Sequence, residues 1–375
     1  METTEKNNSM NAQNSFKHLT VTIIFDGNAL NRDEKIAGNI TAIKKLNYNG
    51  EVRSFISKYA IRHYLFETLV KSKNWSKDAK LIASGSGDKK VIQFDITQSD
   101  ILNNEEMDCF GYMYTEETFT RKAPVGITKA ISLYPYEQDM ALYANHNLVK
   151  RSREQGQTDV QPNLFNKYEH ASYYKVSFTI DTDILGKDTW LVKNFKDQNQ
   201  NNELEISIGG NGKKIKYSQK QENENIIEYT IYNSHKLICQ KIGNDLYKIE
   251  FLVNDKEKQK RICDILSVLK NGLYAQSSGE SNTIIPLVFI AATVKVPSPI
   301  FHPYIDIQKV SNGKIQVIGI NDGLNNDWVE KVYIQRSEKV NIDEGDNIKI
   351  IKEWNNFLKE AGLSNCIQNT QTNEP

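Results

Sequence analysis

His18-Leu-Thr-Val-Thr-Ile-Ile-Phe25 is the segment from which the architecture of this chain can be worked out. Its run of β-branched and apolar residues predicts a buried strand. A segment rich in Gly and Asn follows at residues 27–50 and predicts a loop. Apolar residues then recur at helical spacing over residues 55–70, with Ser54 available as the N-cap. The chain is therefore expected to open with a strand, a loop and a helix.

Three later segments continue this pattern. Residues 173–180 alternate between apolar and polar side chains, which predicts a half-buried strand. Residues 261–271 place their apolar side chains on one helical face and end at Gly272, which predicts a helix with a glycine C-cap. Residues 284–294 predict another buried strand, with Pro286 near its beginning.

Taken in order, these elements make up most of a βαββαβ unit, so the expected class is α+β with a ferredoxin/RRM-like core. The missing strand is expected either in the first of two long insertions, residues 74–170, or beside Tyr173. Two long insertions, residues 74–170 and 187–259, interrupt the unit. Alternating residues around Gly209-Gly-Asn-Gly212 predict a hairpin in the second insertion.

Composition excludes several classes of protein. The 375 residues include 47 Lys or Arg and 47 Asp or Glu, so the chain lacks the basic excess of proteins that bind nucleic acid through their overall charge. No apolar run has the ~20 residues of a membrane span, and no apolar segment typical of a secretory signal follows Met1. We therefore expect a cytoplasmic protein without a membrane partner.

The four cysteines lie far apart and form no CxxC pair, so free thiols are expected rather than a disulfide framework or a zinc site. The polar ends of the chain, residues 1–15 and 366–375, are expected to be disordered tails.

Charge is unevenly distributed along the chain. Residues 27–73 hold nine Lys or Arg against four Asp or Glu, whereas residues 95–120 hold seven acidic residues and no Lys or Arg. Lys58 and Arg62 are four residues apart on the polar side of the predicted helix, a spacing suited to neighbouring phosphates. A solvated helix face is the alternative explanation.

Few residues indicate catalysis. The loop after the first strand lacks the GxxxxGK[ST] and GxGxxG patterns, and the chain has no HExxH or GxSxG, so no metal or cofactor is expected. Asp26 and Asp33 are the carboxylates beside the basic segment and the only acid/base candidates, although a loop aspartate usually serves a turn. In Ser277-Ser-Gly-Glu-Ser281, backbone amides could approach a phosphodiester, and a plain connecting loop is the alternative.

Several motifs together resemble the CRISPR-associated DevR-like proteins, the Cas seven backbone subunits of type I-B Cascade in the RAMP superfamily. In the amino-terminal part they are Leu19-Thr-Val-Thr-Ile-Ile-Phe25, Asn31-Arg-Asp-Glu-Lys35, Gly38-Asn39, Lys44-Lys45 and Ile56-Ser-Lys-Tyr-Ala-Ile-Arg62. Phe110-Gly111, Arg121-Lys-Ala-Pro-Val-Gly-Ile-Thr128 and the Ser277 to Ser281 loop support them. The resemblance covers most of residues 16–300.

The resemblance implies a hand-shaped subunit. Its palm would comprise residues 16–73, 171–186 and 260–365, the finger insertion residues 74–170, and the thumb insertion residues 187–259. Copies would stack along CRISPR RNA and present its bases to target DNA in antiviral defence, in contact with other Cascade subunits. The RNA-binding residues that it implies are Asn31, Arg32, Lys35, Asn39, Lys44, Lys45, Ser57, Lys58, Arg62, Ser278 and Gly279. The thumb residues that the resemblance implies are Ile208, Lys213, Lys214, Ile215 and Lys216.

Two functions are compatible with these observations. The first is a non-catalytic scaffold that binds RNA through its backbone, which leaves specificity to base pairing. The second is an endoribonuclease, because related RAMP subunits cleave target RNA with a loop aspartate, a role open to Asp26 or Asp33. The residues 95–120 would, in a stack of copies, either meet a neighbour's basic surface or remain a solvated acidic loop.

Overall fold

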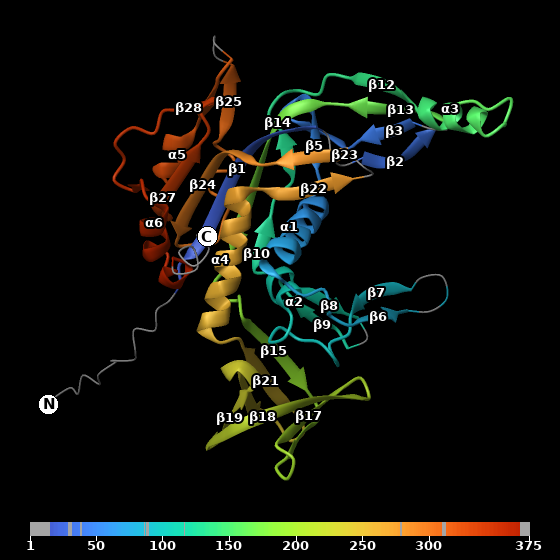
Figure 1. Ribbon diagram of the computed structural model, residues 1–375. Coiled ribbons are helices and arrows are strands. Elements are labelled where there is room, and N and C mark those ends of the chain that lie inside the picture. Colours follow the sequence, from blue (N-terminus) through green and yellow to red (C-terminus); the bar gives the residue numbers. More distant parts are fainter. Residues whose placement is uncertain are drawn as a thin grey trace, which may run out of the picture.

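The computed structural model describes residues 16–28, 32–37, 40–85, 87, 90–115, 117–277, 280–309 and 313–367 (Figure 1). It is an α+β structure, as predicted, built on a mixed sheet from which further small sheets project. Along the main path of the central sheet the strands are β29 (Ile350–Ile351), β27 (Val329–Arg336), β24 (Pro286–Val294), β1 (His18–Asn28), β14 (Ala171–Ile180), β11 (Ala130–Ser132), β5 (Glu51–Ile56) and β4 (Lys45–Tyr48). β10 (Val125–Ile127) pairs with β14 beside that path.

The β1 strand lies at the centre of this sheet and pairs antiparallel with both β14 and β24. Alternate side chains of β1, such as Val21 and Ile23, enter one hydrophobic core, and Ile24 enters a second core on the opposite face. This confirms the buried strand predicted from residues 18–25. A strand covered on both faces needs apolar residues at nearly every position, which is why its sequence was easy to recognise.

Two long helices, α1 (Lys58–Lys73) and α4 (Asp255–Asn271), pack on one face of the sheet, and α6 (Trp354–Glu360) joins the same core. The predicted α4 is confirmed, although it begins six residues earlier, after the Asn254 N-cap. Gly272 ends it with φ of 118°, where a Cβ atom would lie 3.1 Å from the backbone oxygen of Ile284. Only glycine fits that turn without displacing the backbone.

The boundary predicted for the first helix was wrong. Residues 55 and 56 belong to β5, and the N-cap of α1 is Ser57, whose side chain accepts from the Ala60 amide. The Ser54 side chain is buried in hydrogen bonds to His170 and Tyr174. The helical spacing of apolar residues therefore began within a strand that runs directly into the helix.

The strand missing from the sequence pattern lies in the first insertion. β10 and β11 both pair antiparallel with β14, so the chain runs β1, α1, β10 and β11, β14, α4, β24. β14 itself is not the half-buried strand that was expected. Lys175 and Ser177 are buried like the apolar residues between them, because the carboxyl-terminal region covers their face of the sheet.

The segment predicted as a loop at residues 27–50 contains strands instead. β2 (Arg32–Ala37) and β3 (Ile40–Ile43) join β13 (Leu164–Glu169) and β12 (Asp139–Ala144) in a four-stranded sheet. We call this sheet, with α3 (His146–Glu154) at its end, the upper arm (Figure 1). Pairing of β3 with the distant strand β13 stabilises a strand conformation that the local sequence of residues 27–50 does not predict.

A second projection, the lower arm, lies on the same side of the molecule (Figure 1). It consists of β6 (Leu81–Ser84), β7 (Val91–Phe94), β8 (Tyr112–Tyr114) and β9 (Phe119–Arg121), and α2 (Glu105–Phe110) lies beside it. Both arms belong mainly to the first insertion.

The second insertion forms a seven-stranded antiparallel sheet with its own core. In spatial order its strands are β15 (Lys187–Val192), β21 (Tyr247–Leu252), β20 (Lys236–Lys241), β19 (Ile226–Ile231), β18 (Asn211–Asn223), β17 (Glu203–Ile208) and β16 (Phe195–Gln198). A 3-10 turn, η2 (Tyr232–Ser234), links β19 to β20. The predicted hairpin around Gly209 is confirmed as β17 and β18, although it is two strands of a larger sheet.

The carboxyl-terminal region covers the sheet face opposite α1 and α4. β25 (Asp306–Lys309), β26 (Ile315–Ile318) and β28 (Val340–Ile342) form a small sheet beside α5 (Ile320–Leu324). A hairpin of β22 (Leu273–Ser277) and β23 (Glu280–Ile284) precedes β24. No helix in the part of the chain that the structure describes has the length and apolar character of a membrane span.

The expectation that all cysteines are free was wrong for one pair. Cys263 on α4 is disulfide-bonded to Cys366 in η3 (Ser364–Cys366), with their Cα atoms 5.7 Å apart. The two positions are 103 residues apart in sequence, so only the packing of the carboxyl-terminal segment against α4 brings them together. Cys109 and Cys239 are free and buried.

A buried ion network joins the insertions to α4. The Asp108 carboxylate, fully buried, accepts from Arg121 Nη2 at 2.7 Å and from Arg261 Nη1 at 2.6 Å. It also accepts from the backbone amide of Gly186, at the start of the second insertion, at 2.8 Å. Both guanidinium groups are themselves buried, and Asp108 is the carboxylate that they share; Glu257 also pairs with Arg261 at 3.3 Å, and Asp188 lies 4.0 Å from Arg121.

We predict that Asp108→Ala lowers the free energy of unfolding by about 3–5 kcal/mol, because it leaves two buried cations without their shared anion. Chemical denaturation followed by circular dichroism measures the change. The exposed Asp245 provides the control, and Asp245→Ala should change the value by less than about 0.5 kcal/mol. Equal effects of the two substitutions would contradict the role given to Asp108.

Candidate nucleic-acid interface

The predicted RNA-binding residues are described to different extents. Asn31, Asn39, Ser278 and Gly279 lie outside the described residues. Arg32 and Lys35 are placed through their backbone: on β2, Arg32 pairs in register with Ile43, and Lys35 pairs with Thr41. Both therefore lie on the upper arm.

Strand pairing brings Lys44 and Lys45 next to the start of α1. Lys45 pairs in register with Ser54 on β5, and the Phe55 amide donates to the Lys44 carbonyl at 3.0 Å. Because β5 leads directly into the Ser57 cap and Lys58, two lysine-bearing segments that are separate in sequence become neighbours. The Lys45 and Lys58 side chains are both exposed there.

Aromatic rings support Lys45 from two sides. Its Nζ lies 4.6 Å from the centre of the Tyr136 ring and 5.8 Å from that of Tyr168. These cation–π contacts hold an ammonium group in place without neutralising its charge. The sequence did not single out either tyrosine, since each comes from a distant segment whose spacing has no recognisable period.

A buried hydrogen-bond chain fixes β5 beneath these lysines. His170 Nε2 lies 3.2 Å from the Pro135 carbonyl and donates to it, so Nδ1 accepts from the Ser54 hydroxyl at 2.8 Å. The Tyr174 hydroxyl then donates to Ser54 Oγ at 2.7 Å. Burial lowers the pKa of His170, an effect that the Pro135 carbonyl and Glu137 oppose.

The two predicted helix residues differ in their surroundings. Lys58 is exposed, with its Nζ 4.9 Å from the ring centre of Tyr59, which is 71% exposed. Arg62 is half-buried, donates to Glu106 at 2.8 Å, and lies 4.8 Å from the ring centre of Phe110. Lys58 is thus available to a ligand, whereas Arg62 links α1 to α2.

β23 begins beside the upper arm. Its first residue, Glu280, lies 3.8 Å from Lys167 Nζ on β13. Lys167 pairs in register with Thr41, and Thr41 pairs with Lys35. The two segments of the chain that were expected to contact RNA therefore meet through Lys167.

Lys167 is a site residue that sequence reasoning missed. Its Nζ lies 5.2 Å from the ring centre of Tyr143 and 5.6 Å from that of Phe165, and these two rings stack on each other. The signal in the sequence was the interleaving of aromatic and basic residues in Leu164-Phe-Asn-Lys-Tyr-Glu169. We call Lys44, Lys45, Lys58 and Lys167, with Arg32 and Lys35 placed by register, the basic strip.

The two candidate catalytic aspartates are not in a loop, contrary to the prediction. Asp26 is exposed near the end of β1, in register with Tyr173, and Asp33 belongs to β2. The Asp26 carbonyl accepts from the Thr283 hydroxyl at 3.2 Å, which ties this end of β1 to the β22 and β23 hairpin.

Three of the predicted thumb residues are buried. Ile208 and Ile215 belong to the core of the seven-stranded sheet, so neither can wedge between bases in this conformation. Lys213 is buried in an ion pair with Asp100 at 2.9 Å. Lys214 and Lys216 are exposed, and Lys214 lies 3.1 Å from Glu203. Apolar residues around a Gly turn indicated a hairpin correctly but did not reveal what packs on it.

Three acidic residues of the segment 95–120, namely Asp95, Asp100 and Asp108, are buried. Asp100 pairs with Lys213, and Asp108 with Arg121 and Arg261. Asp95 is buried and accepts from Thr97 and Gln98 within its own turn. Much of the local negative charge is therefore neutralised inside the chain, and the expectation of a wholly solvated or neighbour-binding acidic loop was wrong for these residues.

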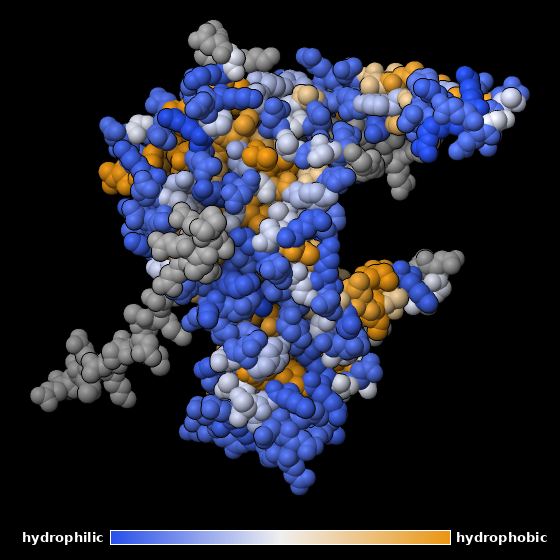
Figure 2. All heavy atoms as spheres, viewed as in Figure 1, coloured by the Kyte–Doolittle hydropathy of each residue, from blue (hydrophilic) through white to orange (hydrophobic). Residues whose placement is uncertain are grey.

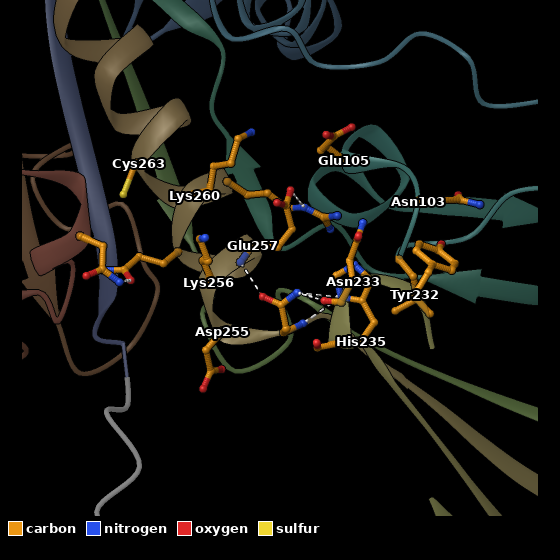
Figure 3. A pocket seen from close by; sticks show the side chains of 16 residues that line it. Asn103, Glu105, Tyr232, Asn233, His235, Asp255, Lys256, Glu257, Lys260 and Cys263 are labelled. Atoms are coloured by element: carbon orange, nitrogen blue, oxygen red, sulfur yellow. Dashed lines mark hydrogen bonds and ion pairs between the residues drawn. The ribbon is translucent and has the colours of Figure 1, made fainter. Parts of the chain in front are cut away.

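A cavity of about 1320 Å³ lies elsewhere, beside the start of α4 (Figure 3). Its walls bear both signs of charge, including Lys256, Lys260, Asp255 and Glu257, and Asn254 bridges to the Asn233 carbonyl at 2.8 Å. None of its lining residues belongs to the basic strip.

One group among the described residues has the composition of a metal site: His18, Asp181 and Asp183. The Nδ1 atom of His18 lies 3.7 Å from Asp181, and its Nε2 atom lies 3.4 Å from Asp183. The Nδ1 atom of His18 accepts from the Thr182 backbone amide at 3.2 Å, so a ring proton lies on Nε2, the nitrogen that faces Asp183.

Comparisons with known proteins agree on one group. A family model described as "CRISPR-associated negative auto-regulator DevR/Csa2" matches residues 19–314. A chain from a solved "CRISPR RNA-guided surveillance complex, pre-nicking" aligns with a TM-score of 0.50 at 8% identity, covering 92% of this chain and 99% of that one. A chain from another "CRISPR RNA-guided surveillance complex" aligns with a TM-score of 0.46 at 10% identity, covering 93% and 99%. No curated protein matches the sequence.

We predict that stability falls as the pH drops from 7 to 5, in part through His170. Because burial lowers the pKa of His170 below its ordinary value of 6.5, the unfolded chain binds more protons, and acid favours unfolding. His170→Gln should therefore lose less stability than the native chain between these pH values. Denaturant unfolding at each pH measures the difference, and identical pH profiles would refute the contribution. His235 and His302 also have lowered pKa values, so some pH dependence should remain.

Proposed function

The chain belongs to the CRISPR-associated DevR/Csa2 family, and from this premise we propose that it is a guide-RNA-binding backbone subunit of a type I Cascade complex. Its fold is similar to that of a chain from an RNA-guided surveillance complex over nearly the whole of both chains. The observation that carries the proposal is the basic strip, in which Lys45 of β4 and Lys58 at the start of α1 become neighbours and Lys167 of β13 lies on the adjoining upper arm.

The chemistry of the strip suits the backbone of a single-stranded RNA. Exposed ammonium groups such as those of Lys45 and Lys58 contact phosphates without reading bases. The bases then stay free to pair with target DNA, which supplies the specificity. The exposed Tyr59 ring offers a surface on which one base can stack.

We further propose that the central sheet with α1 and α4 is an RRM-like palm, formed by residues 16–73, 171–186 and 260–365. The order β1, α1, β10 and β11, β14, α4, β24 supports this assignment, because it is the order of a βαββαβ unit. Residues 74–170, apart from β10 and β11 of the palm sheet, would form the finger domain, and residues 187–259 the thumb. Copies of the subunit would follow one another along the guide RNA, together with other subunits of a type I-B complex in the cytoplasm.

The proposed role is a scaffold without catalysis. Incubating the assembled complex with complementary RNA and Mg²⁺ tests this point. Cleavage that disappears in Asp26→Ala or in Asp33→Ala would establish the endoribonuclease alternative instead.

We predict that the double substitution Lys45→Ala and Lys58→Ala weakens binding to single-stranded RNA of any sequence. Two lost phosphate contacts should lower the slope of log affinity against log salt concentration by roughly 1.4. Fluorescence anisotropy with two RNAs of unrelated sequence, each over a series of salt concentrations, measures the effect. The control is the exposed Lys339 of the carboxyl-terminal region, whose replacement by alanine should leave the slope unchanged.

Arg62→Ala separates a structural role from RNA binding. Because Arg62 is already paired with Glu106 and packed on Phe110, its loss should lower the midpoint of thermal unfolding. Its effect on the salt slope should be smaller than that of Lys58→Ala. An RNA affinity that falls more for Arg62→Ala than for Lys58→Ala would contradict the placement of the strip.

A further inference from the structure

Two exposed aliphatic surfaces lie on the two arms, outside the basic strip. Figure 2 shows hydrophobic side chains gathered over β6 and β7 on the lower arm and over β12 on the upper arm. The lower-arm patch consists of Leu81, Ala83 and Ile92, all exposed. The upper-arm patch consists of Met140, Leu142 and Leu164, also exposed.

The lower-arm patch belongs to a two-stranded ribbon. Pairing of Ala83 with Ile92 places these residues, and Leu81 two positions away, on one face of the ribbon. Leu81 is 61% exposed and Ile92 is 63% exposed. A two-stranded ribbon has little stability of its own, and contiguous exposed aliphatic residues are typical of a surface that another protein covers.

The upper-arm patch occupies one face of a sheet whose other face carries Lys167 of the basic strip. In the pairing of β12 with β13, Met140, Leu142 and Leu164 share a face because Leu142 pairs with Asn166 and Ala144 with Leu164. Lys167, Tyr143 and Phe165 lie on the opposite face. Tyr168 pairs with Met140 and shares the aliphatic face, and its ring centre lies 5.8 Å from Lys45 Nζ, so the aliphatic face adjoins the basic strip at its Met140 end.

We propose that the upper-arm patch of one copy of this chain docks on the lower-arm patch of the next copy. The inference rests on the proposed function, since it names the surfaces through which copies on one RNA would touch. In this contact each aliphatic patch is covered by a surface that is also aliphatic. Within one chain the two patches do not cover each other, because both remain exposed.

Charges beside the patches are complementary. Exposed Lys80 and Lys90 adjoin the two strands of the lower-arm patch, and exposed Glu137 and Asp139 precede Met140 at the start of the upper-arm patch. Opposite charges at the edge of a contact favour the correct partner and orientation. Because the two surfaces differ, the contact is heterologous, and its repetition builds an open chain of subunits rather than a closed dimer.

Two single substitutions test the proposal by complementation. Leu142→Glu disables the upper-arm patch, and Ile92→Lys disables the lower-arm patch. Both positions are largely exposed, so folding should be retained, and circular dichroism checks this; Leu81→Lys replaces Ile92→Lys if that variant fails to fold. The mass of complexes formed on an RNA several binding sites long is then compared for the native chain, each variant and their equimolar mixture.

The native chain should form multimers on the long RNA, and each variant alone should bind as independent single copies. The mixture should form pairs and no longer chains, because each variant keeps the one surface that the other has lost. Variants that assemble like the native chain, or a mixture without pairs, would overturn the proposal and assign the patches to a different protein.

A short RNA of roughly 8 nucleotides separates this inference from the proposed function. Both variants should bind it with native affinity, since neither position belongs to the basic strip. Failure of the native chain to bind it would overturn the proposed function, and association of copies is then measured without RNA at high protein concentration, where absence of self-association overturns the docking proposal as well.

Discussion

The Asp108 carboxylate is the interaction on which the arrangement of the parts depends. It lies on α2 and bonds to Arg121 at the end of the lower arm, to Arg261 on α4 and to the Gly186 amide where the second insertion begins. Desolvating three charges is costly, so the network persists only because each charge is met by a partner of good geometry. Segments that leave the central sheet at different places are thereby fixed to one helix, and the lower arm gains a rigid base.

The burial of β1 on both faces determines which parts of the central sheet a ligand can reach. Helices cover one face and the carboxyl-terminal region covers the other, where Ser177 bonds to Thr22 and to His302 across the interface. The centre of the sheet is therefore closed to ligands. Accessible polar groups are left at its margin, where β4, β5 and the start of α1 meet, and on the arms. This explains how a chain with equal numbers of positive and negative residues can present a local positive surface.

Local sequence was sufficient where one periodicity ran through one element. The strands at β1 and β24, the helix α4 with its Gly272 cap and the β17 and β18 hairpin were predicted correctly. Prediction failed where distant segments determine the environment: β2 and β3 need β13, β14 is buried by the carboxyl-terminal region, and Cys263 meets Cys366 through packing. The site shows the same division. A basic segment was recognisable. Strand register was needed to show that Lys167 joins it, and tertiary contacts were needed to show that Arg62 is already engaged and that Ile208 and Ile215 are inside a core.

The register between β12 and β13 determines two surfaces of the upper arm, the aliphatic face and the opposite face that carries Lys167. Successive side chains of a strand point to opposite faces, so a shift of one residue in β13 against the rest of the upper arm would exchange the positions of Leu164 and Asn166 with those of Phe165 and Lys167. Aliphatic side chains would then face the β22 and β23 hairpin, and the lysine would face outward. Residues inserted between α3 and β13 only lengthen a loop. One residue inserted within β13 alters both faces of the strand at once. The aliphatic face and the lysine-bearing face are therefore constrained to change together.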